Sequence, residues 1–148
     1  VSKGQAYNFG PNGIITAVPE GMRKPNGMVL GLPNLRKIKN SEGTGESWAY
    51  DKLMGRTLVP EYIHPAKTFQ RCIQSLARDI IGDQLVAIAK RYPVVLTVHD
   101  EIVCLAKEEE VDDCVAYMTQ CMTTAPEWCA DLPLACEVGV GDNYMDAK

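Results

Sequence analysis

The chain has 148 residues, 46% of them hydrophobic, which is enough apolar material for one compact domain or part of a larger one. No apolar run approaches the roughly 18 residues that a membrane helix needs, and the first residues lack the apolar segment of a signal peptide. We therefore expect a cytoplasmic protein with no membrane partner. The net charge of −4 divides into +5 over residues 1–74 and −9 over residues 75–148. A basic half suits phosphates, but charge alone is also compatible with ordinary surface variation.

The six cysteines form no Cys-x-x-Cys pair, so their spacing does not indicate a zinc site. In a chain without a secretory segment, they are expected to be reduced and to act as small core residues. The cysteines are Cys72, Cys104, Cys114, Cys121, Cys129 and Cys136.

Residues 1–64 are rich in Pro, Asn and Gly turn signals that separate short apolar runs. This pattern predicts a β-rich hairpin region, with strands at 13–18, 28–32, 48–50 and 57–59. Trp48 and Trp128 are expected to anchor packing, rather than to stack on bases.

A long helix is predicted over residues 65–91, because apolar residues recur at close to helical spacing from Phe69 to Ile88. Pro65 suits the first turn. Gly82 lies inside this helix, where it costs up to about 1 kcal/mol, so we expect it to mark close packing.

A hairpin follows at about residues 94–105, where two apolar, β-branched runs flank His99, Asp100 and Glu101. A second helix is predicted over 108–124, and a final strand at 134–138 is expected to join the same small sheet. The predicted fold class is α+β: a small antiparallel sheet with this hairpin packed on two helices, plus the N-terminal β-rich region.

His99, Asp100 and Glu101 are three consecutive titratable residues between apolar strands. Burying them would be costly, so they are expected at an exposed hairpin tip, where they can converge on a cation or phosphate. Two adjacent carboxylates would attract Mg²⁺, which takes oxygen ligands. The alternative is a polar hairpin turn without further function, since Asp is common in turns.

The sequence Val-His-Asp-Glu between two apolar strands resembles motif C of the family A DNA polymerases. The resemblance implies that Asp100 binds the catalytic metal ions, that His99 lies beside the primer terminus, and that Glu101 is a nearby auxiliary carboxylate. It also implies that the hairpin belongs to the palm domain.

Two further stretches resemble the same family, in the family's order. Residues 73–81 resemble the helix that precedes motif C, where Gln74 matches a glutamine that faces the minor groove of the primer–template. Residues 132–144 resemble the closing segment, with its Pro-Leu, Glu-Val-Gly and Gly-x-Asn-aromatic elements, and the last residues are typical of phage members. The resemblance implies a C-terminal palm segment at residues 65–148, a region adjoining the fingers at 1–64, and, for a viral protein, location in the host cytoplasm.

This chain departs from the family on the helix before motif C. The family often has an Arg and an Asn, eight and four residues before the glutamine, where this chain has Ala66 and Gln70. The neighbouring Lys67 and Arg71 are candidates to substitute, so the predicted DNA contacts are Gln74, Gln70, Arg71 and Lys67.

The function implied by the resemblance is template-directed nucleotidyl transfer with two Mg²⁺ ions, acting on primer–template DNA and deoxynucleoside triphosphates. Nothing in the 148 residues resembles motif A, which supplies the other metal-binding Asp, or motif B, the fingers helix. A further polymerase part that carries both motifs is therefore an expected partner, and the chain alone is expected to be inactive.

Two other functions are compatible with the sequence. A non-catalytic DNA-binding or structural module on a palm scaffold needs no second carboxylate segment. His99-Asp100 also suggests an HD-type metal phosphohydrolase, but such sites need several histidines and only His64 accompanies His99.

Overall fold

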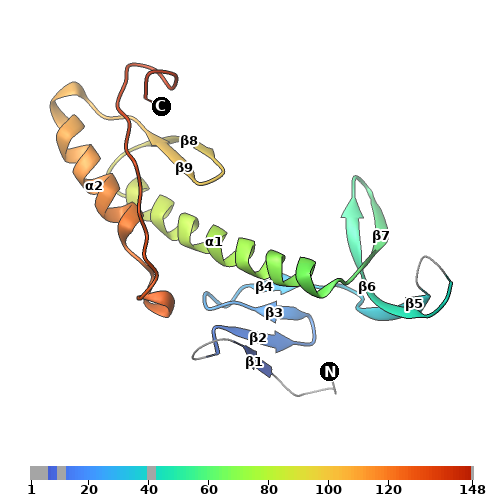
Figure 1. The fold of residues 1–148 in the computed structure, drawn as a ribbon. Coiled ribbons are helices and arrows are strands. Elements are labelled where there is room, and N and C mark those ends of the chain that lie inside the picture. The colour runs from blue at the N-terminus through green and yellow to red at the C-terminus, as the bar shows by residue number, and fades with distance from the viewer. Residues whose placement is uncertain (1–6, 10–12, 40–42, 148) are drawn as a thin grey trace. The chain divides into compact units, whose positions relative to one another are not determined.

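The computed structural model describes residues 7–9, 13–39 and 43–147. The chain divides into two compact units, residues 1–76 and 77–148, and the boundary falls inside a long helix. The predicted α+β class is confirmed, because the structure contains small antiparallel sheets and two α-helices (Figure 1). In the part of the chain described, no helix is long and apolar enough to cross a bilayer.

The first unit contains two antiparallel sheets, with strand orders β1-β2-β3-β4 and β5-β6-β7. The strands of the first sheet are β1 (Tyr7–Phe9), β2 (Ile15–Val18), β3 (Gly21–Arg23) and β4 (Val29–Gly31). Those of the second are β5 (Arg36–Lys39), β6 (Glu46–Met54) and β7 (Thr57–Tyr62). Strands β1, β3 and β5 were not predicted from the sequence, because they are three or four residues long and lack an apolar run.

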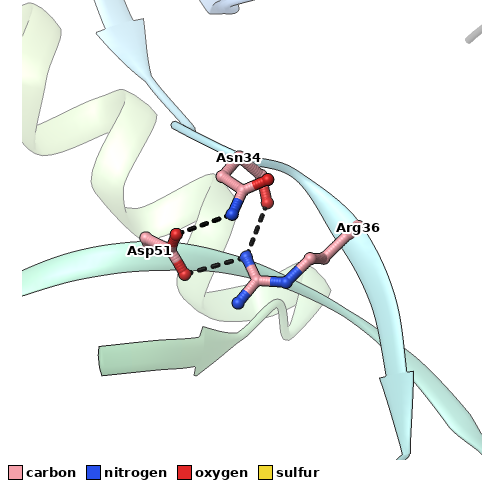
Figure 2. Close-up of polar contacts among 3 residues, drawn as sticks. All are labelled: Asn34, Arg36 and Asp51. Carbon is pink, nitrogen blue, oxygen red and sulfur yellow. Dashed lines mark hydrogen bonds and ion pairs between the residues drawn. The ribbon is translucent and has the colours of Figure 1, made fainter. Parts of the chain in front are cut away.

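The pairing of β5 with β6 is fixed by a polar cluster of Asn34, Arg36 and Asp51 (Figure 2). The Asp51 carboxylate accepts a hydrogen bond from Asn34 Nδ2 at 2.8 Å and pairs with Arg36 Nη1 at 2.8 Å. Arg36 Nη1 also donates to the Asn34 carbonyl at 2.8 Å. Asn34 has φ of +53°, a left-handed conformation that Asn tolerates better than most residues. The cluster therefore joins the start of β5 to the middle of β6.

Buried side chains connect this second sheet to the start of helix α1 (Pro65–Ala89). Ala49 and Tyr50 of β6 are buried, and Arg71 of α1 lies over the Tyr50 ring at 5.0 Å. Cys72 is buried with its sulfur 3.2 Å from that of Met22 on β3. The expectation that Trp48 anchors packing is wrong, because its side chain on β6 is 46% exposed.

The second unit comprises the C-terminal part of α1, strands β8 (Val94–Val98) and β9 (Glu101–Cys104), helix α2 (Val111–Thr123) and the closing segment. Short 3₁₀ turns lie at Glu108–Glu110 and Glu127–Cys129. The predicted hairpin and both predicted helices are thus present, with ends that differ by at most three residues.

Helix α2 is held against α1 and against the hairpin by specific contacts. Tyr117 donates a hydrogen bond to the Ala87 carbonyl at 2.9 Å, and the buried Gln84 donates to the Met122 carbonyl at 2.7 Å. The Cys104 sulfur of β9 lies 3.2 Å from that of Met118 on α2. Two of these contacts join α2 to α1, and the third joins α2 to the hairpin.

The predicted strand at 134–138 is not formed, and residues 131–141 have no strand structure. Alternate side chains from Leu134 to Val138 are half-buried, so the period of two that suggested a strand is real. A strand also needs a partner for its backbone hydrogen bonds, and within residues 7–9, 13–39 and 43–147 no strand other than β8 and β9 belongs to their sheet. The segment is therefore extended without joining the sheet.

The expected close packing at Gly82 is also wrong. A Cβ atom built at Gly82 would meet nothing within 4 Å in the structure. Close approach of backbone occurs instead at Gly139, where a Cβ would collide with the Ala147 carbonyl oxygen.

Candidate active-site hairpin

The turn between β8 and β9 contains only two residues, His99 and Asp100, because Val98 pairs with Glu101. Antiparallel strands joined by two residues need a turn with positive φ, and His99 has φ of +53°. Glycine usually occupies such a position, whereas a non-glycine residue there costs of the order of 1–3 kcal/mol and often marks a functional site. His99, the first of the three titratable residues between the apolar strands, is therefore the strained residue of the turn.

The three candidate residues lie where the sequence placed them, at the tip of the hairpin. His99, Asp100 and Glu101 are all exposed, while the next residue, Ile102, is buried. The apolar strands hold the hairpin on its support, and the turn presents two adjacent carboxylates and an imidazole to solvent. Such a turn can bind a cation or a phosphate ester without burying a charge.

Glu101 is held in place by the closing segment. The Tyr144 hydroxyl donates a hydrogen bond to Glu101 Oε2 at 2.5 Å, although the two residues are 43 positions apart. On the other side of the turn, Arg78 Nη1 of α1 lies 3.5 Å from the His99 carbonyl oxygen. Both ends of the turn therefore contact side chains from other elements of the same unit.

The closing segment can bring Tyr144 to the hairpin because it folds back on itself. The Asn143 side chain accepts hydrogen bonds from the backbone N–H groups of Met145 and Asp146, at 3.0 and 3.2 Å. A Cβ at Gly141 would lie 2.7 Å from the Ala147 nitrogen, so only glycine fits there. The Gly-x-Asn-aromatic element thus has a physical basis in a tight turn that presents its aromatic residue.

Sequence reasoning did not select Tyr144 or Arg78 as site residues. Both were present in the stretches used for the resemblance, Arg78 in the helix pattern and Tyr144 as the aromatic residue of the closing element. Their roles depend on contacts over 21 and 43 residues, which no local pattern reveals.

Partial burial raises the pKa of several cysteine thiols. Burial raises the pKa of Cys104 to about 12, and the neighbouring Cys114 thiol, 3.5 Å away, acts in the same direction. Burial also raises the pKa of Cys72 and of Cys129. Thiols of raised pKa are poor nucleophiles, which fits the predicted role as small core residues.

The predicted DNA contacts Lys67, Gln70, Arg71 and Gln74 lie on one face of α1, because they are spaced at i, i+3, i+4 and i+7. Gln70 and Gln74 are exposed. Lys67 pairs with Glu61 of β7 at 2.5 Å, and Arg71 lies over the Tyr50 ring. The two glutamines are thus presented outward, while the two cations also contact the second sheet.

Gln74 belongs to the first unit and His99 to the second. That both face the primer–template remains a prediction.

The donor set of the turn fits Mg²⁺ chemically. Mg²⁺ in proteins is commonly held by one or two carboxylates, with water and substrate phosphates as the other ligands. Among the described residues, no side chain forms a hydrogen bond or ion pair with the Asp100 carboxylate, and Glu101 retains Oε1 beside the oxygen that Tyr144 holds. Within residues 7–9, 13–39 and 43–147, no three acidic, His or Cys side chains form a group that could hold a metal ion.

Comparison with known proteins agrees with the hairpin and the elements around it. The family model for DNA polymerase family A matches residues 67–146, which is more than half of the chain. No curated protein and no solved structure matches. The matched range includes the α1 residues 67–74, the hairpin turn and the Tyr144 loop. The chain therefore belongs to DNA polymerase family A.

Proposed function

We propose that the β8–β9 turn supplies part of the metal-binding carboxylate site of a DNA-directed DNA polymerase. Asp100 and Glu101 would hold the Mg²⁺ ions, and His99 would lie beside the primer terminus. A further carboxylate would come from a separate segment, motif A, which nothing in these 148 residues resembles. In this proposal residues 65–148 are the palm segment and residues 1–64 adjoin the fingers.

The observation that carries the proposal is the strained, exposed turn. His99 adopts a left-handed conformation at the end of a strand. Arg78 lies 3.5 Å from its carbonyl oxygen, and Tyr144 holds the Glu101 carboxylate at the other end of the turn. A solvated turn without function would need neither the strain nor two long-range contacts. Because the chain belongs to a DNA polymerase family, we infer that the reaction at this turn is transfer of a nucleotidyl group.

Two Mg²⁺ ions in the complete enzyme would supply charge neutralisation at the attacking and leaving oxygens of an in-line displacement. The residues of this chain do the positioning. Asp100 offers ligand oxygens at the turn, and Tyr144 fixes the orientation of the Glu101 carboxylate. Primer–template DNA and deoxynucleoside triphosphates are the partners, with Gln74, Gln70, Arg71 and Lys67 assigned to the DNA.

The test is primer extension by a protein in which these residues follow a segment carrying motifs A and B. Asp100→Ala should lower the extension rate by roughly a thousandfold or more, since the electrostatic stabilisation at the reacting centre is lost. Primer–template binding, measured by fluorescence anisotropy, should stay close to that of the unchanged protein.

Asp131→Ala is the matched control, because Asp131 is also an exposed carboxylate in a loop of the second unit. It should extend primers at the normal rate. Normal extension by Asp100→Ala would show that the turn is not the metal site.

A further inference from the structure

One side of the β5–β6 pair combines the exposed Trp48 with several cations, although Tyr50 on the same side is buried. Lys37 lies directly opposite Trp48 in the β5–β6 pairing, with its Nζ 5.7 Å from the centre of the ring. Lys39 follows two residues along β5 and is exposed. Every second side chain on a strand points to the same side. Lys52, four residues after Trp48 on β6, therefore shares the side of Trp48. We call this surface, defined by Lys37, Lys39, Trp48 and Lys52, the Trp48 face.

The charge of the Trp48 face is positive. Lys52 and Lys67 both pair with Glu61, so that carboxylate is shared between two cations. Lys37 and Lys39 have no ion pair with any residue that the structure describes, although Glu46 lies opposite Lys39. An excess of cations beside an aromatic ring suits a polyanion rather than an apolar partner.

The register that creates this face is enforced from the opposite side of the sheet. Arg36 and Asp51 alternate with Lys37 and Lys52, and the polar cluster in Figure 2 locks their strands together. A slip of one residue would turn every side chain of β5 to the other side. The cluster thus keeps Lys37 opposite Trp48.

We propose that the Trp48 face binds single-stranded DNA, with a base stacked on Trp48 and phosphates held by Lys37 and Lys39. Single-strand sites combine a cationic track with exposed aromatic rings, because every base offers a π-face for stacking. Duplex DNA keeps its bases stacked on one another, so it cannot use the ring. DNA is chosen over other polyanions because the chain belongs to a DNA polymerase family. The site is formed by other residues than the proposed catalytic turn and needs no metal ion.

The test uses the 148-residue chain and a 5′-fluorescein-labelled dT20 oligonucleotide in EDTA, followed by anisotropy over a series of salt concentrations. Trp48→Ala should weaken binding by roughly fivefold to a hundredfold, the range measured for loss of one stacked base. The Lys37→Gln/Lys39→Gln double variant should make the log–log salt dependence shallower by about 1.4, at about 0.7 per phosphate contact on a single strand.

Matched controls change the same residue types in the second unit. Lys90→Gln/Lys107→Gln removes two exposed lysines, and Trp128→Phe removes the other tryptophan. Both should bind dT20 as the unchanged chain does. Asp100→Ala should also bind normally, which separates this proposal from the one for the catalytic turn.

Three results would overturn the proposal. The first is no binding of dT20 at low salt, and the second is equal affinity for dT20 and for a duplex of the same length. The third is normal binding by both the Trp48 and the Lys37/Lys39 variants. Circular dichroism of each variant establishes that its fold is intact, which is expected because the substituted side chains are exposed, except for the half-buried Trp128, which is replaced by another aromatic residue.

Discussion

At the scale of single residues, Tyr144 connects the closing segment to the candidate metal-binding turn. Its hydroxyl holds one oxygen of Glu101, and the tight loop of Gly141 and Asn143 places it there. A hydrogen bond to a charged group contributes about 1.5–3 kcal/mol. The contact is therefore strong enough to decide which way the Glu101 carboxylate points.

We predict that Tyr144→Phe, in a polymerase complete with motifs A and B, lowers the maximal extension rate by about tenfold, because the Glu101 carboxylate loses its fixed orientation. The apparent affinity for primer–template should not change. Single-turnover extension at saturating DNA measures the rate. Adding Tyr144→Phe to a Glu101→Ala variant should give no further loss, since Glu101→Ala has already removed the acceptor of this hydrogen bond.

Tyr117→Phe is the control for this prediction. Tyr117 is another hydroxyl donor of the second unit, and its loss removes the bond to the Ala87 carbonyl. It should lower the thermal midpoint while leaving the extension rate unchanged. An unchanged extension rate for Tyr144→Phe would show that Tyr144 does not contribute to the site.

At the scale of elements, the second sheet depends on two ionised carboxylates. Hydrogen bonds from Asn34 and then Arg36 lower the pKa of Asp51, and those from Lys52 and Lys67 lower the pKa of Glu61. A carboxylate with a lowered pKa in the folded state binds fewer protons than in the unfolded state. Its stabilising effect is therefore present above the ordinary pKa, and is lost as the pH falls through the folded-state pKa.

We predict that the β5–β7 sheet loses stability on acidification below the ordinary pKa values of Glu61 and Asp51, 4.5 and 3.8. Urea unfolding of a Trp128→Phe chain, in which Trp48 is the only indole, measures this for the first unit. Asp51→Asn should lower the midpoint at pH 7 and make it less dependent on pH. An equally steep pH dependence in Asp51→Asn would show that the cluster in Figure 2 does not hold the sheet.

At the scale of the whole molecule, the proposed chemistry requires more than the turn. Two-metal transfer uses carboxylates that clamp both ions, and Asp100 and Glu101 are adjacent on a single hairpin. Mg²⁺ also sheds its waters reluctantly, so a site of this kind binds it weakly without substrate phosphates.

We predict that the 148-residue chain alone gives no primer extension with Mg²⁺ and all four deoxynucleotides. A protein in which it follows a segment with motifs A and B should extend primers, because the positioning groups are then complete. Extension by the short chain, abolished by Asp100→Ala, would show that it carries its own second carboxylate.

Much of the fold was predictable because it follows from local patterns. The helical spacing of apolar residues gave α1 and α2, and two β-branched runs around His99-Asp100-Glu101 gave the hairpin. Short strands such as β5 were not predicted. Three of the four residues of β5 are charged, so it has no apolar pattern, and it forms a strand because it pairs with β6. The strand expected at 134–138 did not form for the opposite reason: its side chains alternate as in a strand, but no described strand pairs with it.

The sequence by itself determined which residues carry the candidate chemistry, because three titratable residues between apolar strands can only be solvated at a turn. Only the tertiary structure decided that Tyr144 holds Glu101, that Trp48 is exposed beside Lys37, and that Gly139 rather than Gly82 is the site of close approach. Each of these depends on residues that are distant in the chain. Local periodicity determines which face a side chain occupies, but long-range packing determines what that face meets.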